Sequence, residues 1–148
     1  MTAQEIFDTV LAHLRAQGVA SVGDGPIGCS TCMYRTPSGL MCAVGCLIPD
    51  EIYTPYMEGE DAHHVLRKYL IPAGLIGDES DPLLADLQWA HDTRMPREPA
   101  KSLADWEQHM SAIASRHGLI YTPPSKGSAM PSDCTNGAQA VKTREVAA

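Results

Sequence analysis

The sequence predicts a small α+β domain in which a β-hairpin packs against about four helices. The helices are indicated by stretches in which apolar residues recur at helical spacing. The hairpin is indicated by a Thr-Pro-Ser-Gly turn at 36–39 between two stretches of strand-like sequence. A chain of 148 residues has room for one such domain.

The first predicted helix begins after Thr2, which forms a capping box with Glu5. Gly18 supplies the left-handed residue that commonly ends a helix. Between them the apolar residues share one face, which predicts a core helix: Ile6, Phe7, Val10, Leu11 and Leu14.

The predicted hairpin begins near Thr31 and turns at 36–39, where Gly39 accepts a left-handed conformation. This turn pairs Thr36 with Leu40 and Tyr34 with Cys42. Side chains alternate along a strand, so one apolar face should meet the helices: Cys32, Tyr34, Leu40, Cys42, Val44 and Cys46. The other face should point outward: Met33, Arg35, Met41 and Ala43.

The rest of the predicted domain is helical. A short helical turn is expected at 47–53, and helices are expected from about Glu60 to Leu70, from Asp81-Pro82 to before Pro96, and from about Ser102 to Gly118. Residues 122–148 carry too little apolar surface to offset the entropy of ordering. We therefore predict a globular domain at 1–121 and a disordered tail at 122–148.

Composition excludes several classes of function. The formal net charge is −7, which argues against a nucleic-acid backbone as the main partner. No apolar run reaches the roughly 18 residues of a membrane span. The N-terminal residues lack the features of a secretion signal, so the expected location is a reducing cytoplasm, where structural disulfides are rare.

Four of the five cysteines fall at 29–46, with the spacing C-x2-C-x9-C-x3-C. The favoured interpretation is buried structural thiols and no cofactor, because free cysteine is among the most buried residue types. A zinc site at Cys29, Cys32, Cys42 and Cys46 is the alternative. Against it, residues 42 and 46 of one strand would lie roughly 13 Å apart, unless the strand ends at Gly45.

A third interpretation is a thiol-dependent hydrolase or transferase, with Cys42 as nucleophile and His91-Asp92 as its base and orienting acid. Adjacent helical residues point about 100° apart, so Asp92 is expected to be poorly placed to orient His91. A core histidine with satisfied hydrogen bonds is the favoured role for His91.

A surface for binding is predicted around the acidic segment 50–61. Arg35 on the outer hairpin face should approach it if the chain folds back. The residues of this predicted surface are Arg35, Asp50, Glu51, Tyr53 and Glu58. The simpler alternative for the carboxylates is favourable charge at a helix start.

The segments Cys32-Met-Tyr-Arg35 and Gly39-Leu-Met-Cys-Ala-Val-Gly-Cys-Leu-Ile-Pro-Asp-Glu51 resemble a family of small uncharacterised proteins of bacteria and their phages. Later landmarks are similar as well, including Trp106 and His117-Gly118-Leu119. The resemblance covers about residues 1–120. It implies a bacterial or phage origin, but no particular biochemical activity. We therefore expect a non-enzymatic protein that binds a protein partner, phage-encoded and acting on a host protein.

Overall fold

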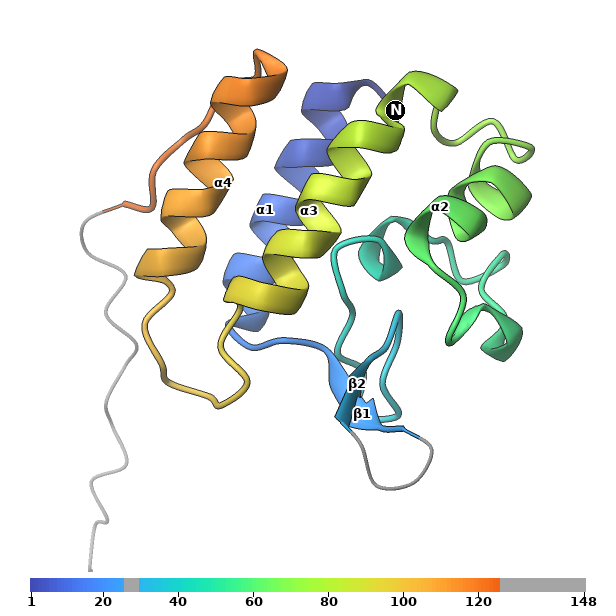
Figure 1. The fold of residues 1–148 in the computed structure, drawn as a ribbon, viewed down its shortest axis with the longest axis horizontal. Coiled ribbons are helices and arrows are strands. Elements are labelled where there is room, and N and C mark those ends of the chain that lie inside the picture. Colours follow the sequence, from blue (N-terminus) through green and yellow to red (C-terminus); the bar gives the residue numbers. More distant parts are fainter. Residues whose placement is uncertain (26–29, 126–148) are drawn as a thin grey trace, which may run out of the picture.

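The computed structural model describes residues 1–25 and 30–125. Its described residues form an antiparallel two-stranded hairpin and four helices, so the α+β class is confirmed. Figure 1 shows α1, α3 and α4 side by side, with α2 beyond α3 and the hairpin at one end of the helices. The predicted tail lies outside the described residues from 126 onward.

Helix α1 spans Ala3–Gln17 and begins and ends as predicted. The Thr2 side chain accepts from the Glu5 amide, and the Glu5 carboxylate accepts from the Thr2 amide at 2.7 Å. Gly18 ends the helix with φ of 69°. The five predicted face residues are all buried, so the helical spacing identified the core face correctly.

The hairpin lies earlier in the chain than predicted. Strand β1, Val22–Asp24, pairs antiparallel with β2, Ser30–Cys32, in a register that places Val22 opposite Cys32. The predicted turn at 36–39 is present, and across it the Thr36 amide donates to the Leu40 carbonyl at 2.9 Å. Only an isolated bridge between Arg35 and Met41 extends this turn, and a 3-10 turn, η2, follows at Gly45–Leu47.

Two contacts explain why the predicted strands do not continue. Glu58 accepts hydrogen bonds from the consecutive backbone amides of Tyr34 and Arg35, which bends the chain there. A Cβ at Gly45 would lie 2.0 Å from the Tyr34 carbonyl oxygen, so the following turn packs directly on this bend. The strict alternation of faces is lost, and Ala43, predicted to point outward, is buried.

Helix α2, Ala62–Val65, is capped by Asp61 and continues without a break into a π-helical segment, η4, at Leu66–Leu70. Short 3-10 turns lie at Pro55–Met57 and Asp78–Ser80. Helix α3 spans Asp81–Arg94 and starts one residue before the predicted position. Helix α4 spans Ala104–His117 and ends at Gly118, as predicted.

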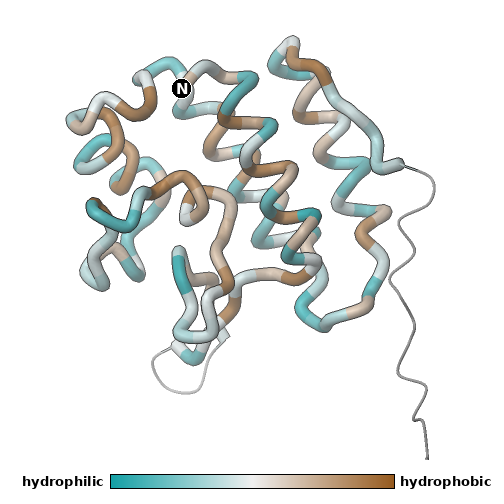
Figure 2. The backbone as a smooth tube through the Cα atoms, turned by 180° about the vertical axis from the view of Figure 1, so that it is seen from behind, coloured by the Kyte–Doolittle hydropathy of each residue, from teal (hydrophilic) through white to brown (hydrophobic). Residues whose placement is uncertain are grey.

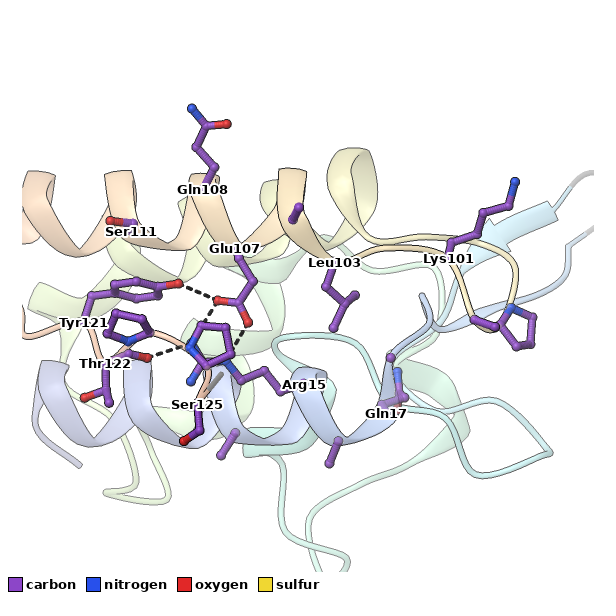
Figure 3. A pocket seen from close by; sticks show the side chains of 18 residues that line it. Arg15, Gln17, Lys101, Leu103, Glu107, Gln108, Ser111, Tyr121, Thr122 and Ser125 are labelled. Carbon is purple, nitrogen blue, oxygen red and sulfur yellow. Dashed lines mark hydrogen bonds and ion pairs between the residues drawn. The ribbon is translucent and has the colours of Figure 1, made fainter. Parts of the chain in front are cut away.

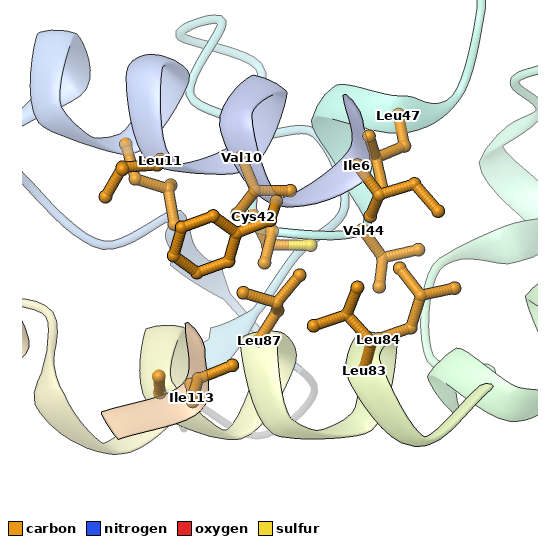
Figure 4. Packing of buried hydrophobic residues seen from close by; sticks show 14 of the residues in the cluster. Ile6, Val10, Leu11, Cys42, Val44, Leu47, Leu83, Leu84, Leu87 and Ile113 are labelled. Carbon is orange, nitrogen blue, oxygen red and sulfur yellow. The ribbon is translucent and has the colours of Figure 1, made fainter. Parts of the chain in front are cut away.

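The core is shared by all four helices and the segment that precedes η2, and α4 contributes Trp106, its largest fully buried side chain. Figure 4 shows Val10 and Leu11 of α1 facing Leu87 of α3, with Cys42 among them. Figure 2 shows hydrophobic and hydrophilic positions alternating along the helices, as expected when each helix buries one face. Within 1–25 and 30–125, no helix has the length and apolar character needed to cross a membrane.

Candidate functional site

Four of the five residues predicted to form a binding surface lie together, and we call Arg35, Asp50, Tyr53 and Glu58 the Arg35 cluster. The guanidinium of Arg35 donates to Asp50 Oδ1 at 2.6 Å and also donates to the carbonyl of Ile48. Its Cζ lies 4.5 Å from the centroid of the Tyr53 ring. The guanidinium is therefore held by an ion pair, a carbonyl and an aromatic face at once.

Glu58 fixes the backbone of this cluster. Its Oε2 accepts from the Tyr34 amide at 3.0 Å, and its Oε1 accepts from the Arg35 amide at 2.9 Å. The same Oε1 accepts from the Tyr53 hydroxyl at 2.9 Å. Burial, together with this bond to Glu58, raises the pKa of Tyr53. One carboxylate thus orients Arg35 through its backbone and Tyr53 through its hydroxyl.

The outer side of the Arg35 cluster is open to solvent. The side chain of Asp50 is 89% exposed, and Tyr56 is 86% exposed. Glu51, the fifth predicted surface residue, is also exposed, although no contact joins it to the cluster. Residues 50–61 contain five carboxylates and no lysine or arginine, and Lys68 pairs with one of them, Glu60, so the segment is acidic overall and includes the exposed Tyr56 ring. Such an arrangement can bind a cationic group of a partner.

A second polar cluster, made of Cys32, His91 and Asp92, lies on the inner side of β2, and we call it the His91 cluster. His91 is fully buried. Its Nε2 accepts from the Ser21 backbone amide at 2.9 Å. Its Nδ1 lies 2.8 Å from Asp92 Oδ1 and 3.7 Å from Cys32 Sγ. The expectation of a satisfied core histidine agrees with this geometry, whereas the expectation that Asp92 could not orient His91 is wrong.

These contacts fix the tautomer of His91. A backbone amide can only donate, so Nε2 carries the lone pair and Nδ1 carries the proton, which it donates to Asp92. The nitrogen that faces Cys32 therefore has no lone pair with which to accept the thiol proton. Burial, followed by the interaction with Asp92, raises the pKa of Cys32 to about 12. This is the opposite of what a nucleophilic thiolate requires.

Cys42, the predicted nucleophile, lies in the core. It is 1% exposed, and its Sγ accepts from the Gly45 amide at 3.3 Å. Burial raises its pKa, and burial also raises the pKa of Cys46 to about 12. The thiol that contacts His91 is that of Cys32, and no local sequence pattern indicates this pairing across 59 residues.

The three described members of the predicted zinc site, Cys32, Cys42 and Cys46, form no group of candidate ligand atoms with one another. Among the described residues, only Cys32, His91 and Asp92 bring three candidate ligand atoms within 4.8 Å of one another. Cys29 lies outside the described residues. A metal on His91 Nδ1 would require the proton on Nε2, where it would face the Ser21 amide, a second donor. The His91 cluster fits hydrogen bonding better than metal binding.

An open groove of about 1520 Å³ lies between α1, α4 and residues 121–125 (Figure 3). In it the Arg15 guanidinium donates to both oxygens of Glu107, and the Tyr121 hydroxyl donates to Glu107 at 2.7 Å. Arg15 also donates to the Thr122 carbonyl at 2.7 Å. Its hydrogen bond to Glu107 raises the pKa of Arg15. These contacts tie the segment after α4 to the helices. No local sequence pattern indicates them, because Arg15 and Glu107 lie 92 residues apart.

Comparisons with family models, curated proteins and solved structures find no match to this chain.

Proposed function

We propose that this chain is a small interaction protein that binds a protein partner through the Arg35 cluster and the exposed residues beside it. The observation that carries this proposal is the 86% exposure of Tyr56, which lies in the chain between Tyr53 and Glu58, two members of the fixed cluster. A cytoplasmic setting, in which a phage-encoded chain acts on a bacterial protein, belongs to the same proposal.

Preorganisation supports a binding role for this surface. Arg35, Tyr53 and Glu58 are joined by hydrogen bonds and by stacking, so their side chains lose little freedom when a partner docks. Arginine and tyrosine are also enriched among the residues that dominate binding energy at interfaces.

Charge supports a basic partner. Asp50 faces water with most of its surface, and Glu51 beside it is exposed. Arg35 neutralises only part of the negative charge of residues 50–61. A partner that presents lysine or arginine side chains would complement this surface and associate faster at low salt.

A site-specific crosslink tests the proposal. A photoreactive phenylalanine analogue replaces Tyr56 in one variant and Ile120 in a control, because Ile120 is 74% exposed but lies outside the proposed surface. In bacterial lysate we expect one defined crosslinked protein at position 56 and none at position 120. Excess wild-type chain should compete with this crosslink, and excess Asp50→Asn chain should compete at least several-fold less well.

The proposal is contradicted by equal crosslinking at both positions, or by equal competition by the two chains. Added salt should also weaken the specific crosslink, because charge complementarity between exposed groups is screened. A crosslink that strengthens with salt would point to an apolar contact and would contradict the basic partner.

A further inference from the structure

We propose that the open groove between α1 and α4 is a docking site for the chain's own residues 126–131, which continue the segment already seated there. One part of the groove holds residues 121–125, and the rest has no occupant among the described residues. The proposal does not depend on the Arg35 cluster or on a partner. It commits to a contact within one molecule, so a second copy and another protein are outcomes that the test must distinguish.

The segment after α4 shows how the groove holds an extended chain. The Gln4 side chain donates to the Ile120 carbonyl at 3.0 Å and accepts from the Ile120 amide at 2.8 Å. Further along, Arg15 donates to the Thr122 carbonyl, and its Cζ lies 5.6 Å from the centroid of the Tyr121 ring. Side chains of α1 therefore pair with the backbone of this segment, and a backbone contact of this kind does not depend on the side chain at the bonded position.

The seated segment has a definite direction. It is bound by Gln4 near the start of α1 and then by Arg15 near the end of that helix, so the chain runs toward the C-terminus of α1. Figure 3 shows Ser125 in one part of the groove and Leu103 and Lys101 toward its other end. Ser125 is the last residue that the structure describes at this end of the chain. Residue 126 therefore begins inside the groove.

The open part of the groove is lined mainly by small or apolar residues. They are Ala16 and Gly18 at the end of α1, Leu103 and Ala104 at the start of α4, and Pro99 and Ala100 in the loop between α3 and α4. Leu103 is only partly buried, so some of its apolar surface still faces water. An apolar side chain that covers Leu103 is favoured, because both surfaces then leave water.

The sequence after Ser125 supplies such a side chain. Ala129, Met130 and Pro131 form a short apolar run, and Met130 is the largest apolar residue beyond Ser125. Methionine is unbranched and adapts its shape to irregular apolar surfaces. We therefore assign Met130 as the residue that packs on Leu103.

The length of the chain permits this contact. Leu103 lies one helical turn, about 6 Å, before Glu107, which accepts from the Tyr121 hydroxyl. An extended chain advances about 3.3 Å per residue, so the five residues after Ser125 span up to about 16 Å. Met130 can therefore reach Leu103 while the seated segment stays in place. A short linker gives an effective concentration of about the millimolar order, which a separate molecule would have to exceed.

A crosslink within the full chain tests the proposal. A photoreactive phenylalanine analogue replaces Met130 in one variant and Val141 in the control, because both are apolar positions beyond Ser125. Crosslinked peptides are identified by mass spectrometry. We expect position 130 to crosslink to Leu103 or Ala104 several-fold more than position 141 does. Equal yields from the two positions would overturn the proposal.

A mixture of unlabelled and nitrogen-15-labelled chains distinguishes a contact within one molecule from a contact between two copies. We expect each crosslink to join two peptides of the same label. Crosslinks that join the two labels at the frequency of random pairing would overturn the proposal in favour of a second copy. The same crosslinking is repeated in bacterial lysate, where transfer of the crosslink from the groove to another protein would also overturn it.

A second measurement keeps the native side chain at position 130. In chains with carbon-13-labelled methionine and leucine methyl groups, we expect a nuclear Overhauser contact between Met130 and Leu103. Ala104→Glu should abolish it, because Ala104 lines the groove at the first position of α4, where a carboxylate is favourable for the helix. Ala112→Glu is the matched control, at an exposed position of α4 outside the groove, and should keep the contact. No contact in wild type, or the same contact in both variants, would overturn the proposal.

Discussion

The His91 cluster and the Arg35 cluster each take one residue from the segment 32–35, yet they are built in opposite ways. The first contains a fully buried neutral ring with both nitrogens paired. The second contains charged groups that are paired on their inner side and exposed on their outer side. Burial therefore separates a polar cluster that supports the fold from one that remains available to a partner.

The difference also decides which chemistry is available. Burial raises the pKa values of the Cys32 and Cys42 thiols, so both remain protonated. The exposed carboxylates of residues 50–61 stand in water, where charge is not penalised. The proposed contact with a partner therefore falls at the Arg35 cluster, and the described thiols lack the lowered pKa that a nucleophile requires.

The largest loss of stability is expected when a buried polar side chain is removed. His91→Ala leaves the Ser21 amide without an acceptor and opens a cavity next to it. We expect a loss of about 3 kcal/mol in the free energy of unfolding, measured with denaturant. His64→Ala provides the exposed control. Equal stability of the two variants would show that the His91 cluster does not support the fold.

A somewhat smaller loss is expected at the Arg35 cluster. Glu58→Ala removes the acceptor for the amides of Tyr34 and Arg35, so we expect the free energy of unfolding to fall by about 2 kcal/mol. Glu51→Ala, the matched control, should change it by less than about 0.5 kcal/mol because Glu51 is exposed. A comparable loss in both variants would remove the distinction between a fixed and a free carboxylate.

High pH should destabilise the fold through the thiol of Cys46. Burial raises the pKa of Cys46 from 9.0 to about 12, so its stabilisation is fully present below pH 9.0 and is lost as the pH rises towards 12. Cys46→Ser keeps a donor for the Ala43 carbonyl and does not titrate in this range. Its unfolding constant should rise less steeply with pH than that of wild type, by up to about tenfold per pH unit. Parallel curves above pH 9.0 would contradict the burial of this thiol.

A change at the exposed residue Asp50 should weaken partner binding and leave the stability of the fold unchanged. Asp50→Asn keeps the shape of the side chain and removes its charge. We expect unchanged unfolding and at least several-fold weaker competition for the Tyr56 crosslink, because Asp50 is 89% exposed. A large loss of stability would instead make Asp50 part of the fold.

The smallest expected effect is that of a chelator. Because His91 Nδ1 carries a proton and the described cysteines Cys32, Cys42 and Cys46 are not gathered, a chelator should leave the midpoint of thermal unfolding unchanged. Elemental analysis of the same sample provides the comparison. Stoichiometric zinc, with a lower midpoint after chelation, would restore the site predicted at Cys29, Cys32, Cys42 and Cys46.

The helices could be predicted because their information is local. The capping box at Thr2 and Glu5, the periodic apolar face of α1 and the terminal Gly18 all lie within one segment of sequence. The same holds for the turn at 36–39, whose residues determine its backbone directly.

The hairpin and the contacts of the site depend on residues far apart in the sequence. Thr31 could pair forward or backward, and its pairing with Gly23 was not evident from alternation alone. Cys32 approaches His91 only when distant segments of the chain meet. The same is true of Glu58, which accepts hydrogen bonds from two backbone amides far from it in sequence. The grouping of Arg35, Asp50, Tyr53 and Glu58 was predicted on the condition that the chain folds back, as it does.

The two hydrogen bonds that Glu58 accepts from backbone amides have a further consequence for how the chain behaves at high concentration. An unpaired strand edge is a template on which a second molecule can add a strand and begin to aggregate. Beyond β2, the amides of Tyr34 and Arg35 are occupied by a side-chain carboxylate instead of another strand. Because β2 is short and is followed by a bend and a bound carboxylate, an incoming strand would find few free backbone groups to pair with. We therefore expect Glu58 to limit edge-to-edge association as well.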